Sequence, residues 1–163
     1  MRGIRRKEKA IESKDEIISI IKNAQFITIA MSLNDEPYLV TLSHGYDEEN
    51  YCMYFHCAKE GKKIDILKKN NIVWGQALKD EGYVDGSCDH LYTTVHFRGR
   101  VTFLESSEEK KHALQVMINS LESNPKAVIK KQVTEESVKR VNMGRIDIEF
   151  MSGKKSDEVI LSL

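Results

Sequence analysis

The residues best suited to chemistry lie between Pro37 and Asn70, where two predicted strands precede a predicted helix. Side chains alternate across a strand, so each strand offers one set of polar groups on a common face. In the first strand this set is Leu39, Thr41 and Ser43. In the second strand it is Cys52, Tyr54 and His56. If the two strands pair, hydroxyls, a phenol and an imidazole reach one surface, which suits a ligand with an apolar ring and a polar rim.

A basic run from Lys59 to Lys63 follows at the predicted start of the helix. The first turn of a helix offers unpaired N–H groups and a partial positive charge, which favour a bound anion. Gly61 allows close approach of the backbone, and Lys62 and Lys63 add full charges. A phosphate monoester matches this arrangement, while a solvated helix face is the alternative interpretation of the lysine pair. The residues alone therefore favour a phosphate-bearing aromatic cofactor.

The elements that must position these groups follow from changes of hydrophobic period. Ser13 and Glu16 form a candidate capping box before isoleucines at helical spacing, which predicts a helix over residues 14–24. Further helices are expected over 58–70, 105–121 and, in short pieces, 126–139. Strands are expected at 25–33, 38–45, 51–57, 71–78, 91–104 and 141–151, with a polar loop at 80–90 and a turn at 153–155. Short polar turns between the first three strands predict an antiparallel meander, and the pattern favours one antiparallel barrel over a doubly wound sheet.

Composition excludes several classes of function. The 163 residues fit a single domain over 1–163, with residues 1–10 as a basic N-terminal arm. Basic and acidic residues are equal at 25 each, so no global charge indicates a nucleic-acid partner. No apolar stretch is long enough to span a bilayer, so no membrane partner is expected. With no secretory signal ahead of them, the three cysteines indicate reduced thiols in a cytoplasmic protein.

The order of several short motifs carries a family resemblance. The most specific motif consists of His56, Ala58, Gly61 and Lys63. The supporting segments are Ser43 to Tyr46, Tyr92 to Val95, Phe97 to Val101, Arg145 to Glu149 and Ser152 to Lys155. Together they resemble the flavin-nucleotide-binding branch of the pyridoxamine-5′-phosphate-oxidase-like superfamily, which includes the nitroimidazole-resistance proteins. The likeness covers most of the chain.

The resemblance implies a mainly β fold with flanking helices, a six-stranded antiparallel split β-barrel of the FMN-binding type. Two protomers of a homodimer then build two FMN sites at their interface. Beside the isoalloxazine ring, the resemblance places Val40, Thr41, Leu42 and Ser43. It places Lys62 and Lys63 near the phosphate, and Thr94 where the family usually has a phosphate-binding serine. His56 corresponds to a histidine near the reactive face of the cofactor and is the candidate catalytic residue.

The implied activity is that of an FMN-dependent oxidoreductase acting on a small-molecule substrate or electron acceptor, with nitroaromatic compounds as one family example. The alternatives are a non-catalytic flavin-binding module and a relative that holds haem or a deazaflavin on the same barrel. Authentic pyridoxamine-phosphate oxidases carry a C-terminal Arg-x-His element, whereas this chain ends at Val159–Leu163 without one. Synthesis of vitamin B6 is therefore not expected.

Each candidate side chain also has a structural interpretation. For His56 the alternative is a half-buried structural histidine, and His44 is either structural or a contact at the rim. Trp74 belongs to the core or the dimer interface, or else touches the flavin region. Cys57 lies on the strand face opposite His56, so it is a buried thiol rather than a nucleophile paired with that histidine.

Two further segments carry alternatives. Cys88 and His90 flank Asp89 in a loop, but two potential ligands in a loop do not make a zinc site, which needs three or four, so no metal is expected. The arm that contains Arg2, Arg5, Arg6 and Lys7 is a solvated tail, or else it crosses to the other protomer and meets the phosphate.

Overall fold

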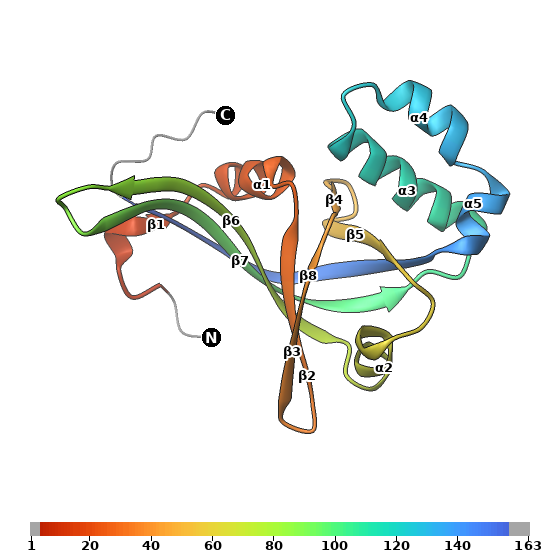
Figure 1. Ribbon diagram of the computed structural model, residues 1–163, viewed down its shortest axis with the longest axis horizontal. Helices are drawn as coiled ribbons and strands as arrows, with labels where there is room; N and C mark the ends of the chain where they lie inside the picture. Colours follow the sequence, from red (N-terminus) through yellow and green to blue (C-terminus); the bar gives the residue numbers. More distant parts are fainter. Residues whose placement is uncertain (1–3, 157–163) are drawn as a thin grey trace.

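The computed structural model describes residues 4–156 (Figure 1). The strands are β1 (Ala10–Ile11), β2 (Ile27–Leu33), β3 (Glu36–Leu42), β4 (Gly45–Asp47), β5 (Cys52–Cys57), β6 (Ile72–Val84), β7 (Asp89–Phe103) and β8 (Asn142–Lys155). The helices are α1 (Lys14–Asn23), α2 (Lys62–Lys69), α3 (Ser107–Leu121), α4 (Pro125–Gln132) and α5 (Glu135–Arg140), with a 3₁₀ turn η1 at Lys7–Lys9. Arg2 of the predicted arm and the C-terminal Val159–Leu163 lie outside the described residues.

All eight strands form one antiparallel sheet, in the order β3-β2-β6-β7-β8-β5-β4, with β1 paired to β8 beside this path. The path starts at β3 and ends at β4 without closing, as expected of a split barrel. The prediction of a six-stranded antiparallel barrel is confirmed in class, and the short strands β1 and β4 raise the count to eight. Among the described residues, no helix is both long and apolar enough to cross a membrane.

Local chemistry explains the first elements. The Ser13 side chain accepts a hydrogen bond from the Glu16 backbone N–H at 3.3 Å and so caps α1. Asn34 and Asp35 both adopt positive φ, 51° and 63°, which is the conformation of a two-residue hairpin turn. This turn sets the register of β2 against β3, from Leu33 opposite Glu36 to Ile27 opposite Leu42. The predicted first helix and first hairpin are confirmed.

The main hydrophobic core lies on the inner face of the sheet. Its central strands contribute alternate residues, Ile27, Ile29 and Met31 from β2, Val73 and Ala77 from β6, and Val95 and Phe97 from β7. Helix α1 adds Ile17, Ile18 and Ile21, and α2 adds Ile66 and Leu67. Helix α2 therefore packs against the same core as β2 and β5.

A second apolar cluster lies beneath α3, on the opposite side of β5. It contains Cys52, Tyr54, Ala113, Met117 and Met143. Helix α3 rests directly on β4, because a Cβ atom on Gly45 would lie 2.7 Å from Met117 Cα. Helices α4 and α5 follow α3 at the same end of the molecule (Figure 1).

One buried carboxylate fixes α3 to the sheet. Asp47 accepts hydrogen bonds from His112 Nε2 at 2.7 Å, from the Asn50 side-chain amide at 2.8 Å and from Tyr54 Oη at 3.3 Å. Burial alone would raise the pKa of Asp47, but the bonds from His112 and Asn50 outweigh it and lower the pKa to about 2. Asp47 is therefore ionised at neutral pH and accepts bonds from both α3 and β5.

Two of the predicted loops are wrong. The polar loop at 80–90 is instead a strand hairpin, because β6 runs to Val84 and β7 begins at Asp89. A register shift between Asp80 and Gly82, where Gly82 has φ of 102°, accommodates the polar residues within the ladder. The predicted turn at 153–155 is also strand, since Gly153 and Lys154 pair with both β7 and β1.

The predicted meander and the predicted arm are corrected as well. β3 pairs with β2 and β5 pairs with β4 and β8, so β3 and β5 are not neighbours and share no paired surface. The strand order depends on how apolar side chains are buried across the whole sheet, and short turns alone do not determine it. Arg5, Arg6 and Lys7 are exposed, as a solvated tail predicts, but the end of the arm is held to the fold, because Lys7–Lys9 forms η1 and Ala10 pairs with Lys154.

Candidate functional site

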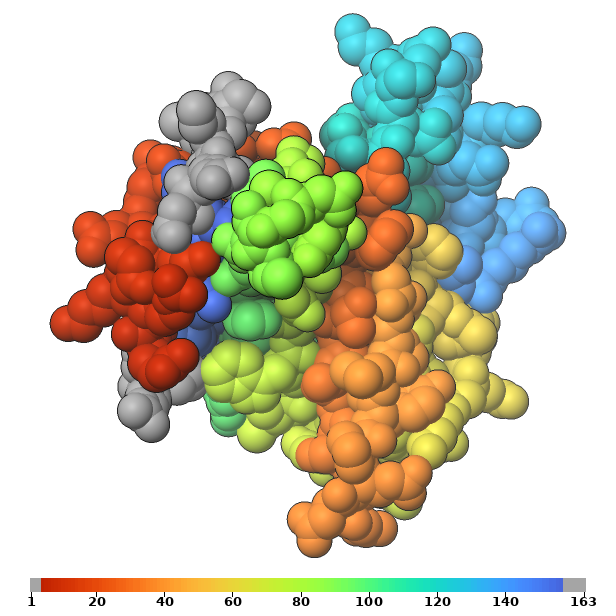
Figure 2. Space-filling view, turned by 60° about the vertical axis from the view of Figure 1, so that its left-hand side comes forward, coloured from red at the N-terminus to blue at the C-terminus, as the bar shows by residue number. Residues whose placement is uncertain are grey.

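The predicted ring-binding segment, Val40 to Ser43, alternates between the core and the surface. Thr41 and Ser43 are exposed together with Leu39, whereas Val40 and Leu42 are half-buried against the core. The Thr41 hydroxyl lies 3.0 Å from the Thr28 hydroxyl on β2. The outer side of β3 therefore presents one large apolar side chain and two hydroxyls, as the alternation predicted. Figure 2 shows the β2–β3 hairpin in orange beside the yellow-green atoms of β6.

The predicted phosphate-binding residues lie at the start of α2. Gly61 has φ of 128° and nothing lies within 4 Å of the position of a Cβ atom there, so the backbone is open to approach. Lys62 Nζ lies 2.8 Å from Glu36 Oε1 and 4.9 Å from the centre of the Tyr38 ring. The hydrogen bond that Lys62 donates to Glu36, and then the negative charge of Glu36, raise the pKa of Lys62. Lys62 therefore links α2 to the tip of the β2–β3 hairpin.

Lys63 takes a different direction from Lys62. Its Nζ lies 5.6 Å from the centre of the buried Phe55 ring on β5. Lys62 is exposed and Lys63 is half-buried, so the two ammonium groups flank the first turn of α2 from its two sides. The two lysines place positive charge at the N-terminus of α2, where the helix dipole is also positive.

The hydroxyl of Thr94 is already engaged within the sheet. Thr94 is 5% exposed, donates to the Ala77 carbonyl at 3.1 Å and accepts from Gln76 Nε2 at 3.0 Å. It lies on β7 opposite Leu78, whereas Lys62 contacts β3 at its other end. Thr94 and the Lys62 contact on β3 are thus separated by three strand spacings, roughly 15 Å across the sheet, and by a further offset along the strands. One protomer does not bring Thr94 and the lysine pair together.

His56 lies exposed near the end of β5, two residues before the turn that leads to α2. The side chains that share its strand face, Cys52 and Tyr54, are buried under α3. The predicted common surface of β3 hydroxyls with Tyr54 is therefore wrong, and of the β5 set only His56 is accessible. Cys57 packs toward the main core, on the other face from His56, as predicted.

Two other candidate side chains have clear positions. His44 is 2% exposed, and its Nε2 lies 2.9 Å from the Ile21 carbonyl. Burial lowers the pKa of His44, only partly offset by that bond, so the ring is a neutral structural group. Trp74 is 41% exposed on β6, with its ring 6.1 Å from that of Phe150. Trp74 therefore belongs to a surface and not to the core.

Five strands, β3, β2, β6, β7 and β8, form a broad outer face of the sheet. The sequence did not predict this face. One row runs through Leu39, Ala30, Trp74, Arg98 and Phe150. The next row is polar and consists of Thr41, Thr28, Gln76, His96 and Ser152. A row with the large apolar side chains Leu39, Trp74 and Phe150 beside a polar row provides a surface that suits a flat ring with a polar rim.

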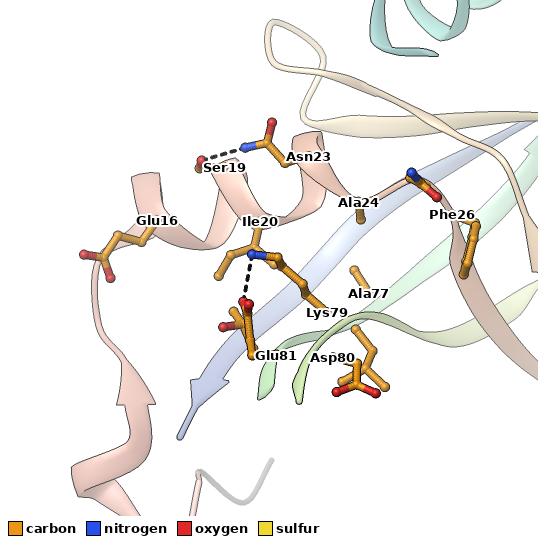
Figure 3. A pocket seen from close by; sticks show the side chains of 13 residues that line it. Glu16, Ser19, Ile20, Asn23, Ala24, Phe26, Ala77, Lys79, Asp80 and Glu81 are labelled. Carbon is orange, nitrogen blue, oxygen red and sulfur yellow. Dashed lines mark hydrogen bonds and ion pairs between the residues drawn. The ribbon is translucent and has the colours of Figure 1, made fainter. Parts of the chain in front are cut away.

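A cavity of about 900 Å³ lies between α1 and β6 (Figure 3). Glu16, Ser19 and Asn23 line it from α1, and Lys79 and Glu81 line it from β6. The remaining lining residues are Ile20, Ala24, Gln25, Phe26, Ala77, Leu78, Asp80 and Thr93. No motif predicted this cavity, because its walls come from segments about sixty residues apart and because Asp80 and Glu81 were expected in a loop.

Comparison with known proteins identifies the family. The family model described as pyridoxamine 5′-phosphate oxidase matches residues 13–155. No curated protein matches the chain in sequence. Among solved structures, a protein assigned to 5-nitroimidazole antibiotic resistance from Bacteroides thetaiotaomicron is 29% identical, with a TM-score of 0.77 over 90% of this chain and 86% of that chain.

Two more distant structures share the fold alone. The flavocytochrome Anf3 from Azotobacter vinelandii is 13% identical, with a TM-score of 0.80 over 99% of this chain and 75% of that chain. A FAD-binding protein from Mesorhizobium loti is 20% identical, with a TM-score of 0.66 over 91% of this chain and 97% of that chain. The split barrel and the family model, which spans nearly the whole chain, agree. The chain therefore belongs to the pyridoxamine 5′-phosphate oxidase family.

Proposed function

We propose that this protein binds FMN as a homodimer and acts as a flavin-dependent oxidoreductase on a small-molecule acceptor. The observation that carries the proposal is the outer side of β3, where exposed Thr41 and Ser43 lie on the hairpin that Lys62 joins to the open backbone at Gly61. An apolar surface with hydroxyls suits an isoalloxazine ring, and an open helix start with two lysines suits a phosphate.

The residues present fit this cofactor in part. Val40 to Ser43 offer backbone and hydroxyl groups along the ring, and Lys62 and Lys63 supply the charge for the phosphate. Thr94 fits less well, because its proton is given to Ala77 and because β7 lies three strands away from β3, the strand that Lys62 contacts. A phosphate held by Lys62 and Lys63 of one protomer is therefore reached by Thr94 only from the second protomer. This arrangement fits two shared sites in a homodimer.

FMN, when bound, supplies the redox chemistry, and the chain supplies binding, orientation and proton transfer. Thr41 and Ser43 hydrogen-bond the polar rim, and the half-buried Val40 and Leu42 hold their strand against the core. His56 is the accessible imidazole of β5, and we assign it the donation of a proton to the acceptor. The thiols of Cys52, Cys57 and Cys88 are free, in keeping with a cytoplasmic protein.

The purified protein's absorption spectrum tests this proposal first. Bands close to those of free flavin are expected, and a Soret band would instead favour a haem-binding relative. Binding of FMN and riboflavin is then compared by fluorescence quenching. FMN should bind at least about tenfold more tightly, because each charge-assisted phosphate contact contributes on the order of 1.5–3 kcal/mol. Equal affinities would contradict the phosphate site.

Reduction by NAD(P)H followed by reoxidation with a nitroaromatic compound separates an enzyme from a flavin-binding module. Turnover above that of free FMN supports the oxidoreductase. A flavin that stays bound and is reoxidised no faster than free FMN supports the non-catalytic alternative.

A further inference from the structure

The cavity between α1 and β6 exists because one strand edge is left unpaired. β2 pairs with β6 only from Thr28 to Ala30, opposite Gln76 to Trp74, yet β6 continues to Val84. In the described part of the chain no strand pairs with this side of β6 beyond Gln76. Helix α1 and the segment from Ala24 to Phe26 stand off from that edge, and about 900 Å³ remains between them. This volume is in the range of sites for small molecules.

A buried hydroxyl in the cavity wall lacks a hydrogen-bond partner. Thr93 is 1% exposed, and its Oγ1 makes no hydrogen bond to any described residue. Thr93 lies opposite Lys79 on β6, on the same sheet face as Val95 and Phe97, so its side chain faces α1 and the cavity. Buried polar groups in folded proteins almost always have a partner. A ligand in the cavity would supply one.

The charge of the lining selects the sign of the ligand. Glu16, Asp80 and Glu81 bring carboxylates, and Lys79 is the single cation in the lining. Lys79 Nζ is paired with Glu81 Oε1 at 2.9 Å (Figure 3). The Gly82 N–H, and then His90, hold the pKa of Asp80 below its usual value, so Asp80 is ionised. Among the described residues Glu16 has no ion pair, and the cavity keeps a net negative charge that repels phosphates and carboxylates.

The remaining lining is suited to an apolar body. Ile20 and Ala24 from the α1 segment face Ala77 from β6, and Phe26 and Leu78 add large side chains that are 54% and 56% exposed. Exposed apolar side chains that are grouped in one patch are typical of a binding surface. Ser19, Asn23 and Gln25 add neutral hydrogen-bonding groups.

We propose that this cavity binds a small organic cation, an apolar or aromatic body that carries a protonated amine. The amine lies near Glu16, the body packs between Ile20 and Ala77, and the Thr93 hydroxyl bonds a polar atom of the ligand. The site is separate from the proposed FMN phosphate site, because neither Lys62 nor Lys63 lines it. The proposal goes beyond the flavin chemistry and holds whether or not the protein binds FMN.

Three probes that share one indole body test the sign of the charge, namely tryptamine as the cation, tryptophol as the neutral analogue and indole-3-acetate as the anion. Isothermal titration calorimetry on the full chain should give affinity in that order, with tryptamine at least about tenfold tighter than tryptophol, as expected of one charge-assisted contact. Indole-3-acetate binding as tightly as tryptamine, or no binding of tryptamine, would overturn the proposal.

Variants test the named residues. Glu16→Gln should weaken tryptamine binding about tenfold and leave tryptophol unchanged. Its matched control is Glu109→Gln, which changes the same position after the capping serine of α3 and lies outside the cavity. Thr93→Val should weaken all three probes and keep or raise the unfolding midpoint, because the change removes an unpaired buried hydroxyl.

The assignment would be wrong if Thr93→Val left the binding of all three probes unchanged. It would also be wrong if Glu16→Gln bound tryptamine as tightly as Glu109→Gln does. The Lys62→Ala, Lys63→Ala double variant separates this site from the flavin site. It should lose FMN affinity and keep tryptamine affinity. A parallel loss of both would show that tryptamine occupies the flavin site and not this cavity.

Discussion

At the scale of single residues, two adjacent threonines on β7 have opposite surroundings. Thr94 donates to Ala77 and accepts from Gln76, while the equally buried Thr93 has no partner among the described residues. Alternation along the strand places them on opposite sides of the sheet. The hydroxyl of Thr94 therefore stabilises the sheet through its two hydrogen bonds, whereas the hydroxyl of Thr93 forms no hydrogen bond with a described residue that would stabilise the fold.

Removal of the two hydroxyls should have different effects on stability. Thr94→Val leaves the Gln76 amide without its acceptor and should lower the free energy of unfolding by about 1–2 kcal/mol. Thr93→Val should leave that free energy unchanged or raise it. Urea unfolding of both variants beside the wild type gives the comparison. An equal loss in both would mean that Thr93 is also a structural hydroxyl.

His56 is the accessible imidazole of β5 and is assigned proton donation to the acceptor. His56→Ala should leave the fold and FMN content nearly intact but slow flavin reoxidation by a productive acceptor, by about 10²–10⁴-fold. Stopped-flow absorbance of reduced holoprotein measures this rate, with the exposed His90→Ala as control. A variant that loses flavin while its remaining holoprotein turns over normally would make His56 structural.

At the scale of elements, helices hold the open barrel together through a few polar contacts. Lys62 joins α2 to the β2–β3 hairpin through Glu36, and Asp47 joins α3 to β4 and β5 through His112 and Tyr54. The first contact is exposed and contributes little to stability, while the second is buried and contributes more. The α2 contact therefore matters mainly for placing the lysine that we assign to the proposed flavin site.

The Asp47 contact should make stability depend on acid pH. Its pKa falls from an ordinary 3.8 to about 2 in the folded protein, so folding favours the ionised form. The resulting stabilisation, about 2 kcal/mol, is complete above pH 4 and is lost as the pH falls from 4 to 2. Urea unfolding of the wild type and Asp47→Asn between pH 5 and pH 2.5 measures it. The two proteins should converge toward low pH, and a constant difference would contradict the assignment.

The start of α2 should determine FMN affinity. Lys62→Ala with Lys63→Ala removes one or more charge-assisted phosphate contacts, so FMN should bind at least about tenfold more weakly and riboflavin should be unaffected. Fluorescence titration compares both ligands. Lys68→Ala with Lys69→Ala, in the last turn of the same helix, is the matched control and should change neither affinity. An equal loss of affinity for riboflavin and for FMN would show that the two lysines do not contact the phosphate.

At the scale of the whole molecule, the outer sheet face remains exposed in a single chain. Leu39 on β3 and Trp74 on β6 are 64% and 41% exposed, with β2 between these two strands. The proposed homodimer would cover this face and would bring Thr94 of one protomer toward the lysine pair of the other. Both the cofactor site and the apolar face then require the second chain.

Trp74→Glu should therefore break the dimer and reduce FMN binding together. Analytical ultracentrifugation at micromolar concentration should give twice the 18.7 kDa chain mass for the wild type and the chain mass for the variant. Leu121→Glu, which changes an exposed apolar residue at the end of α3, should remain dimeric. A wild-type monomer with flavin still bound would refute the shared site.

The sequence by itself determined the parts that local chemistry controls. The Ser13 cap, a short polar turn between the first two strands and the alternation of β3 were all predicted from neighbouring residues. The motifs from His56 to Lys63 also indicated the family that the comparison confirmed. These features depend on short stretches, so one sequence contains what is needed to infer them.

Only the tertiary structure decided which strands are neighbours and what each side chain meets. Alternation assigned Cys52 and Tyr54 to a face, but α3, from far along the chain, buried that face. Likewise, the loop predicted at 80–90 became the free edge of β6, and with α1 it encloses the cavity and Thr93. Pairing between distant strands is selected by burial summed over the whole sheet. No local pattern encodes that sum, so the cavity could not be inferred from the residues that line it.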